Sequence, residues 1–324
     1  MPRSSRRAGS PLTGLGTVVA KETADHLSGV RMIVIEALVF LVALVVAWFS
    51  TATIRENIGE SPFLFLRLLT IAPEPIPFSF IGMVGLVTPV IAIALGFDAV
   101  NAEFNQRTLS RVLAQPIYRD ALLIGKFLAR LLSLTIALLS LWLLVLGLGF
   151  VRLGLPPSLE ELIRMLGFLL ATIAYGGVWL ALAMLFSVLF RAPATAALAA
   201  LGLWLLFALF WTTMITPLAS TLIAGPQQGI FGPNVAYFNT EQVLERLSPN
   251  TLYAETARAL LNPETRALGF VFVTLSEARS MVSAPLPMVQ SFILIWPQLT
   301  GLIAAMLVIF VISYVAFQRQ EIRA

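Results

Sequence analysis

The charged residues of this chain gather in one short segment between two apolar stretches. Residues 101–120, NAEFNQRTLSRVLAQPIYRD, carry Glu103, Arg107, Arg111, Arg119 and Asp120. On a helix that starts near residue 101, the side chains of Glu103, Arg107 and Arg111 would recur every four residues along one face. Glu103 stands four residues before Arg107, which is the favourable order for an ion pair on a helix. The spacing therefore predicts a helix with one charged face.

An apolar patch on the other side would make this helix amphipathic. The patch consists of Leu109, Val112 and Leu113. Pro116 should end the helix, because proline disfavours helical backbone at the residue before it, and Asp120 is placed to cap the next helix. Two interpretations stay open from these residues alone: the helix lies on lipid headgroups, or it docks onto a partner protein.

Other patterns that carry chemistry are missing from the sequence. The chain has no cysteine and one histidine, His26, so it offers neither a thiolate metal site nor a histidine-rich one. Gly125 and Lys126 resemble the end of a phosphate-binding loop. However, Asp120 stands at the position of its first glycine, and Phe127 at that of its Ser or Thr. We therefore expect no catalytic residue, no metal and no cofactor in this chain, and no enzyme activity of its own.

The composition is that of a membrane protein. Of the 324 residues, 58% are hydrophobic and 12% are charged, against about 25% charged in soluble domains. Six runs are long and apolar enough to cross about 30 Å of hydrocarbon as helices. They are 30–51, 80–100, 121–151, 162–190, 193–215 and 291–317. We therefore predict an all-α polytopic membrane protein with six transmembrane helices.

The distribution of Lys and Arg indicates the orientation. Six spans place both termini on one side, and that side, which also holds loop 98–120, carries 13 of the 21 Lys and Arg residues. The positive-inside rule then makes both termini cytoplasmic, in a multi-pass protein of the inner (plasma) membrane. The net charge of +4 and the pI near 9.8 follow from this bias. We expect membrane lipids around the chain and no nucleic acid.

The chain divides into four regions. These are a cytoplasmic arm with an amphipathic helix (1–29), spans one to five with loop 98–120 (30–215), an extracytoplasmic loop subdomain (216–290), and the last span with a cytoplasmic tail (291–324). In the arm, Arg6 and Arg7 are typical of an export signal, but charges such as Glu22 interrupt any apolar core. Capping residues and prolines in the outer loop predict two or three short helices on the outer surface.

Ionisable residues in or beside the spans are few. Glu36 lies about two turns into the first run and Asp98 lies at the end of the second. We interpret both as boundary residues, because two isolated carboxyl groups do not form a proton path. The third run would be about 46 Å long as a helix. Its first turns should therefore protrude and let Lys126 and Arg130 reach the headgroups.

The stretch 96–131, GFDAVNAEFNQRTLSRVLAQPIYRDALLIGKFLARL, resembles the region between the second and third spans of ABC transporter permeases of the type-2 exporter class. Members show an acidic residue, Glu-x-x-x-Gly-Thr-Leu, a leucine-rich turn, Pro-x-x-Arg, and Gly-Lys opening the next helix. The matching residues are Asp98, Glu103, Thr108, Leu109, Leu113, Pro116, Arg119, Gly125 and Lys126. Arg107 stands where these permeases usually have glycine. A regular helix accepts arginine at this position, whereas a left-handed turn there would strain it. The enlarged last outer loop is similar to that of one branch of this class, the permeases of nitrous-oxide-reductase copper maturation.

The resemblance implies a membrane subunit that is driven by ATP hydrolysis in another chain. Two permease chains, identical or closely related, would form the translocation path, and two copies of an ABC ATP-binding subunit would bind ATP and Mg. Residues 103–113 would be the coupling helix that enters the ATP-binding subunit, and residues 12–30 the connecting helix. The coupling residues implied are Asp98, Glu103, Arg107, Thr108, Leu109, Arg111, Pro116 and Arg119.

Two other functions remain open from the sequence. A self-contained secondary transporter or channel would need ion-coupling residues of its own, and the spans offer Glu36 and Asp98. A scaffold protein would use loop 216–290 as its interaction surface. The spans are apolar throughout, which permits lipid, lipopeptide or drug-like cargo and selects none of them.

Overall fold

The structure is a computed structural model that describes residues 14–56, 63–105, 119–229, 232–265, 268 and 286–319. These residues are helical almost throughout, with one antiparallel pair of short strands, β1 (Gln228–Gly229) and β2 (Gly232–Pro233). The helices are α1 (Leu15–Ser28), α2 (Val30–Glu56), α3 (Leu64–Thr70), α4 (Phe80–Gly96), α5 (Asn101–Asn105), α7 (Arg119–Leu153), α8 (Leu159–Leu189), α9 (Pro193–Leu205), η2 (Leu206–Ile215), α10 (Thr216–Ala224), α11 (Val235–Glu245), α12 (Pro249–Leu261) and α14 (Met288–Arg319).

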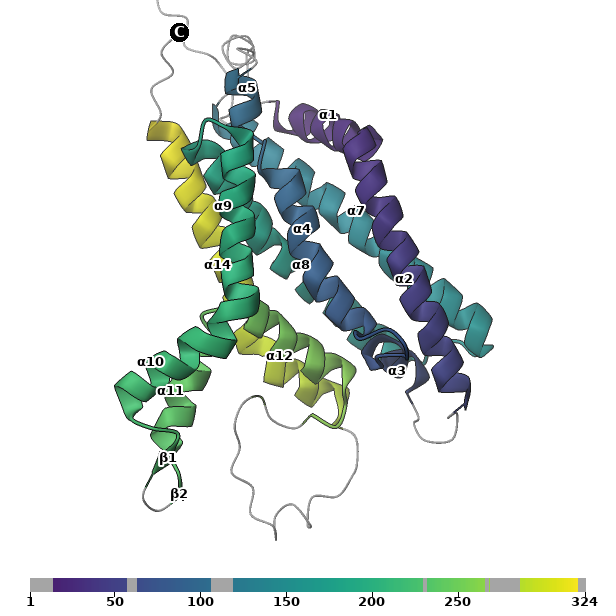
Figure 1. The fold of residues 1–324 in the computed structure, drawn as a ribbon. Coiled ribbons are helices and arrows are strands. Elements are labelled where there is room, and N and C mark those ends of the chain that lie inside the picture. Colours follow the sequence, from purple (N-terminus) through teal and green to yellow (C-terminus); the bar gives the residue numbers. More distant parts are fainter. Residues whose placement is uncertain are drawn as a thin grey trace, which may run out of the picture.

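Six of the described helical stretches are long and apolar enough to cross a membrane. They are Val30–Arg55, Phe80–Glu103, Asp120–Leu153, Leu159–Leu189, Pro193–Ala224 and Met288–Arg319. The prediction of an all-α polytopic protein with six spans is confirmed at this level of length and composition. The spans run between two ends of a bundle, one carrying α1 and the other α12 (Figure 1). We call these the α1 end and the α12 end.

Helix α8 lies at the centre of the bundle and packs against α4, α7, α9, α12 and α14. Its start is set by a capping box, in which Ser158 and Glu161 each bind the other's backbone N–H. Farther along, Gly177 lets α14 approach closely, because a Cβ there would collide with the sulfur of Met306. Small residues permit such close helix packing in membranes. The central helix is therefore fixed both at its start and along its length.

The helices that follow the fifth span lie at the α12 end, and whether this end is the outer side stays a prediction. Helix α12 packs against α8 and α14. Its buried face includes Tyr253, Ala257 and Leu260, and the Tyr253 ring stacks on Tyr175 of α8 with centroids 4.4 Å apart. Burial of this face removes apolar surface from water, so α12 forms part of the bundle.

The fifth span continues beyond its predicted end at residue 215. Helix α9 runs into η2, a π-helix, and then into α10, which turns away from the bundle beside α11 (Figure 1). Pro217 is tolerated because it stands in the first turn of α10, where its missing N–H costs little. The wider π-helical turn thus lies at the bend between the span and the α12-end helices.

Candidate functional site

A cluster of buried cations and partly buried carboxylates occupies the α1 end. Lys126, near the start of α7, places its Nζ 2.6 Å from Glu103 Oε1 of α5 and 3.5 Å from Glu22 Oε1 of α1. The Lys126 residue is 4% exposed. A buried ammonium is costly unless it is paired, and here two carboxylates from different helices pair with it.

Arg130, one turn further along α7, extends the cluster. Its Nη1 lies 3.3 Å from Glu22 Oε2, and its Nε donates to the Leu95 carbonyl oxygen at 2.8 Å. Arg130 is 3% exposed. We call Glu22, Glu103, Lys126 and Arg130 the ion-pair cluster. It joins α1, the end of α4, α5 and α7 through charged groups.

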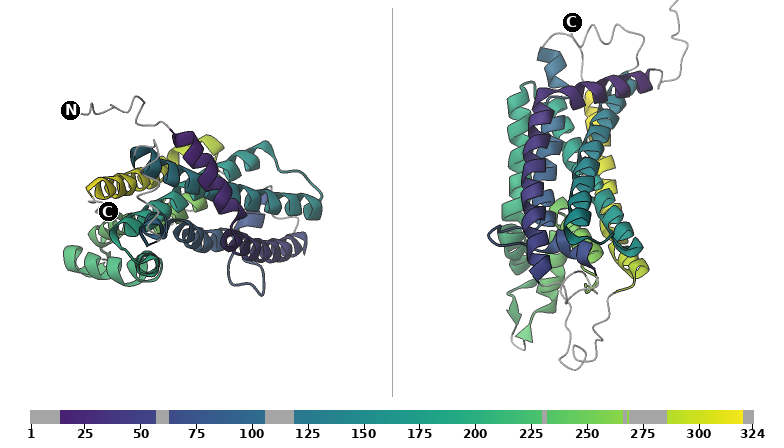
Figure 2. Two further views of the ribbon diagram at one scale, coloured as in Figure 1. Left: turned by 90° about the horizontal axis from the view of Figure 1, so that it is seen from above. Right: turned by 90° about the vertical axis from the view of Figure 1, so that its right-hand side faces the viewer.

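The expectation that Lys126 and Arg130 reach lipid headgroups is wrong. Both side chains turn inward because α1 lies across the end of the bundle beside α7 and supplies the Glu22 carboxylate (Figure 2). Helix α1 can come this close because position 125 is glycine: a Cβ there would lie 2.7 Å from Cγ1 of Val18. The glycine at position 125 therefore lets α1 pack closely against α7, and Lys126 pairs with the Glu22 carboxylate of α1.

Asp98 makes a separate, more exposed pair at the same end. Its Oδ2 accepts from Arg31 Nη1 of α2 at 2.8 Å, and the Arg31 guanidinium lies 5.1 Å from the centre of the Phe97 ring. Exposed ion pairs contribute little to stability. We therefore expect this pair to orient the turn between α4 and α5 and to add little to the stability of the fold.

Short helix α5 is also bound to the end of α8. The amide of Asn101 donates to the Phe190 carbonyl at 3.3 Å, and the amide of Asn105 donates to the Arg191 carbonyl at 3.0 Å. The Ser187 hydroxyl accepts from the backbone N–H of Asn101 at 3.3 Å. A displacement of α5 would therefore disturb hydrogen bonds to the end of α8 as well as the ion pairs with α1 and α7.

The protonation of the cluster follows from its surroundings. Burial raises the pKa of Glu22, but the charges of Lys126 and Arg130 outweigh burial and leave that pKa below its usual value. Burial, and then the positive charge of Arg130, lower the pKa of His26 to about 4. At neutral pH Glu22 is therefore ionised and His26 is neutral, so the cations of α7 face a carboxylate on α1.

Asp120, which the sequence predicts as a cap of the third span, stands in the first turn of α7. Its Oδ1 accepts hydrogen bonds from Tyr314 Oη at 3.0 Å and from the Gln318 amide. Both partners belong to the last turns of α14. Asp120 thus connects the start of the third span to the end of the sixth.

Only part of the predicted coupling site lies within the described residues. Asp98 and Glu103 are both ion-paired there. Arg107, Thr108, Leu109, Arg111 and Pro116 lie outside the described residues, and of Arg119 only the backbone, at the start of α7, is described. The helix of residues 103–113 stays a prediction beyond Asn105. Sequence reasoning missed Glu22, whose signal was two cations, Lys126 and Arg130, that needed carboxylates once buried.

Comparison with known proteins identifies the family. The family model described as ABC-2 family transporter protein matches residues 16–322, nearly the whole chain. The chain belongs to the ABC-2 transporter family. The match includes α1 from its second residue onward and all four residues of the ion-pair cluster.

Two relatives of this ABC-2 permease place it more closely. One is the probable ABC transporter permease protein NosY of Pseudomonas aeruginosa, 32% identical over 244 residues, which are 73% of this chain and 78% of the relative. The other is the probable ABC transporter permease protein NosY of Stutzerimonas stutzeri, 28% identical over 210 residues, 62% of this chain and 69% of the relative. The resemblance stated from the sequence is confirmed: this is an ABC-2 permease of the NosY-like branch.

Family membership defines the coarse function. The ABC-2 permease is a multi-pass membrane subunit of an ABC transporter, and its relatives are permease subunits rather than enzymes. The family implies partnership with an ATP-binding subunit.

Proposed function

We propose that this permease is the membrane-spanning subunit of an ABC exporter and that the α1 end receives the conformational change of the ATPase. Two permease chains form the translocation path, and two ATP-binding subunits, which hold ATP and Mg, dock below them. The docking element is the segment from Glu103 to Leu113. Both termini and this segment lie on the cytoplasmic side of the inner membrane, as the Lys and Arg distribution supports.

The observation that carries the proposal is the position of Glu103. It stands at the base of the predicted docking segment and contacts Lys126 Nζ at 2.6 Å. Lys126 in turn contacts Glu22 of α1, and α5 is bound to the end of α8 through Asn101 and Asn105. A movement of the docking segment would therefore be transmitted to α7, α1 and α8 through polar contacts.

A self-contained secondary transporter is less well supported. It would need carboxyl groups in the spans that bind and release an ion. Of the two candidates, Asp98 is ion-paired with Arg31 at the α1 end. Glu36 is one half-buried residue on α2, and a single carboxyl group does not form a path.

Copurification tests the coupling. A tagged chain extracted in mild detergent is expected to retain an ABC ATP-binding subunit. Glu103→Ala should lower the ATPase activity of the complex about tenfold or more, because it removes a charged contact at the base of the docking segment. The matched control is Glu74→Ala, an exposed carboxylate toward the α12 end. Unchanged association and unchanged ATPase activity in Glu103→Ala, or a wild-type chain that retains no ATPase, would contradict the proposal.

Cysteine labelling tests the orientation. The sequence has no cysteine, so one introduced cysteine is the only thiol of the chain. Ser110→Cys is expected to react with a membrane-impermeant maleimide only after the cells are permeabilised, whereas Glu264→Cys should react in intact spheroplasts. Labelling of Ser110→Cys in intact spheroplasts would reverse the proposed orientation.

A further inference from the structure

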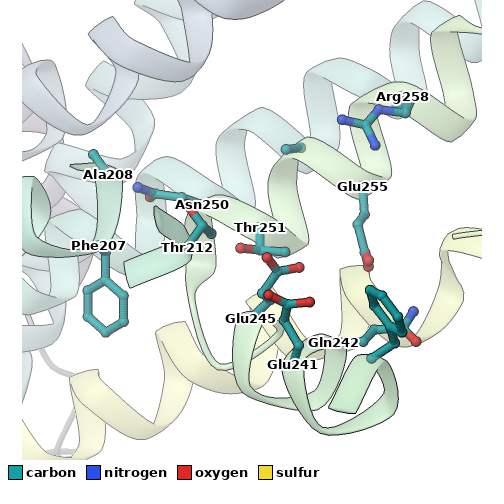
Figure 3. A pocket seen from close by; sticks show the side chains of 12 residues that line it. Phe207, Ala208, Thr212, Glu241, Gln242, Glu245, Asn250, Thr251, Glu255 and Arg258 are labelled. Atoms are coloured by element: carbon teal, nitrogen blue, oxygen red, sulfur yellow. The ribbon is translucent and has the colours of Figure 1, made fainter. Parts of the chain in front are cut away.

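A cavity of about 530 Å³ lies at the α12 end, where η2, α11 and α12 meet (Figure 3). Its volume falls in the range of about 300 to 1,000 Å³ that is usual for small-molecule sites. Its lining includes Phe207, Phe238, Glu241, Glu245, Thr251 and Glu255. The cavity is remote from the ion-pair cluster, and the proposed coupling makes no use of it.

Three carboxylates face this cavity, and they differ in how they are satisfied. Glu255, 8% exposed, accepts from Arg246 Nε at 3.0 Å and from the Gln298 amide at 2.9 Å. Glu241 accepts from the Tyr237 hydroxyl at 3.2 Å. Within the described part of the chain, Glu245 has no ion pair. Among the described residues, Glu241 and Glu245 thus both lack a cationic partner, whereas Glu255 has one.

The crowding of these carboxylates has a measurable consequence. Burial, followed by the negative charges of Glu241 and Glu255, raises the pKa of Glu245. Such repulsion is relieved when a cation enters between like charges. The wall also holds one cation, Arg258, so the lining keeps an excess of acidic groups.

The cavity walls carry a second feature that points to a ligand. The hydroxyl oxygen of Thr251 is fully enclosed and has no hydrogen-bond partner in the described residues, although buried polar groups are normally paired. In Figure 3, Thr251 points toward the carboxylates of Glu241 and Glu245. The π-helix η2 contributes the ring of Phe207, and α11 that of Phe238. Aromatic faces attract ammonium and guanidinium groups.

We propose that this cavity binds a small organic cation, an amine or a guanidinium compound, with Glu245 and Glu241 as its counter-charges. The Phe207 and Phe238 rings cover the apolar part of the cation, and the Thr251 hydroxyl, unpartnered in the described part of the chain, lies beside the two carboxylates. A bare metal ion fits less well: among the described residues, no group of three His, Cys, Asp or Glu side chains could hold one. The volume of the cavity is also far larger than one ion fills.

Calorimetric titration of the purified full-length chain in nanodiscs, with whatever subunits copurify, tests this. The probes are benzylamine and benzyl alcohol, which share the ring and differ in the charged group. Benzylamine is expected to bind, and to bind at least about tenfold more tightly than benzyl alcohol, because charge-assisted contacts are worth about that factor. This comparison uses the wild-type chain and so does not depend on the folding of any variant. Equal dissociation constants for the two probes, or no binding of benzylamine, would overturn the proposal.

Variants then assign the site. Glu245→Gln keeps the shape of the side chain and should weaken benzylamine binding about tenfold, and Phe207→Leu should weaken it less. Glu264→Gln, an exposed carboxylate outside the cavity, is the matched control and should leave binding unchanged. If Glu245→Gln binds benzylamine as Glu264→Gln does, or if calcium chloride binds more tightly than benzylamine and displaces it, the organic-cation assignment is wrong.

Discussion

Lys126→Met is expected to lower the free energy of unfolding by about 3 to 5 kcal/mol. Methionine has a similar length, so little volume is lost, but the partly buried carboxylates of Glu22 and Glu103 lose the charge that lies 3.5 Å and 2.6 Å away. Removing one partner of a buried pair costs more than the pair contributes, because the remaining charge stays desolvated. Equilibrium unfolding in mixed micelles measures the change.

The control for this variant is Lys21→Met. Lys21 is exposed on α1, next in sequence to Glu22, and its replacement removes the same charge at a position where ion pairs contribute little. Lys126→Arg keeps the charge and should retain more stability than Lys126→Met. Equal unfolding free energies for Lys126→Met and Lys21→Met would show that the ion-pair cluster does not stabilise the α1 end.

A double variant separates charge from packing. In Lys126→Met/Glu103→Gln, a neutral amide replaces the carboxylate that lost its partner. The decrease in the free energy of unfolding should therefore be smaller than the sum of the decreases in the two single variants, by about 1 kcal/mol or more. Additive losses would mean that the two side chains act independently, in spite of the 2.6 Å contact. The same set of proteins, assayed for retained ATPase, tests whether the contact also serves coupling.

The spans were predictable because their signal is local. A run such as 162–190 shows its length and lack of charge within its own residues, and α8 occupies Leu159–Leu189. The extension of the fifth span was not predictable in this way. The residues of η2 are as apolar as those of α9, so neither composition nor period distinguishes a π-helix from an α-helix.

Residues of the candidate site at the α1 end were predictable only where they belong to a recognisable sequence motif. Asp98 and Glu103 stood out by resemblance, and both are ion-paired. The partner Glu22 is 104 residues from Lys126, and nothing in the local sequence of either residue specifies the other. Snorkelling was a reasonable expectation for an isolated α7, and it failed because α1 covers these cations. Tertiary packing decided the role of the same side chains.

Arg164 is the second residue whose removal should be severe, and no sequence motif marks it. It is 0% exposed, and its guanidinium donates to the carbonyl oxygens of Leu260 at 3.2 Å and Leu286 at 2.6 Å and to the Ser291 hydroxyl at 2.9 Å. An ion pair with Glu160 at 2.8 Å completes its contacts. One side chain therefore holds the end of α12 and the start of α14 against α8.

Arg164→Met is expected to lower the free energy of unfolding by about 3 kcal/mol or more, because each buried acceptor left without a donor costs about 1 to 3 kcal/mol. The loss should be local first. Proteolysis near Leu286 should accelerate before the rest of the chain unfolds, since the link between α8 and the start of α14 is gone. Arg164→Lys keeps the charge but has no forked donors and should be intermediate, while Arg55→Met, at the exposed end of α2, should behave as wild type.

The Arg164→Met variant also bears on the cavity at the α12 end. Helix α12 supplies Asn250, Thr251 and Glu255 to its wall, and Arg164 anchors the far end of the same helix at Leu260. If that anchor sets the position of α12, benzylamine binding should weaken in Arg164→Met and stay intact in Arg55→Met. Intact binding together with faster cleavage near Leu286 would show instead that the cavity is held by the stack of Tyr253 on Tyr175 and that Arg164 anchors α14 alone.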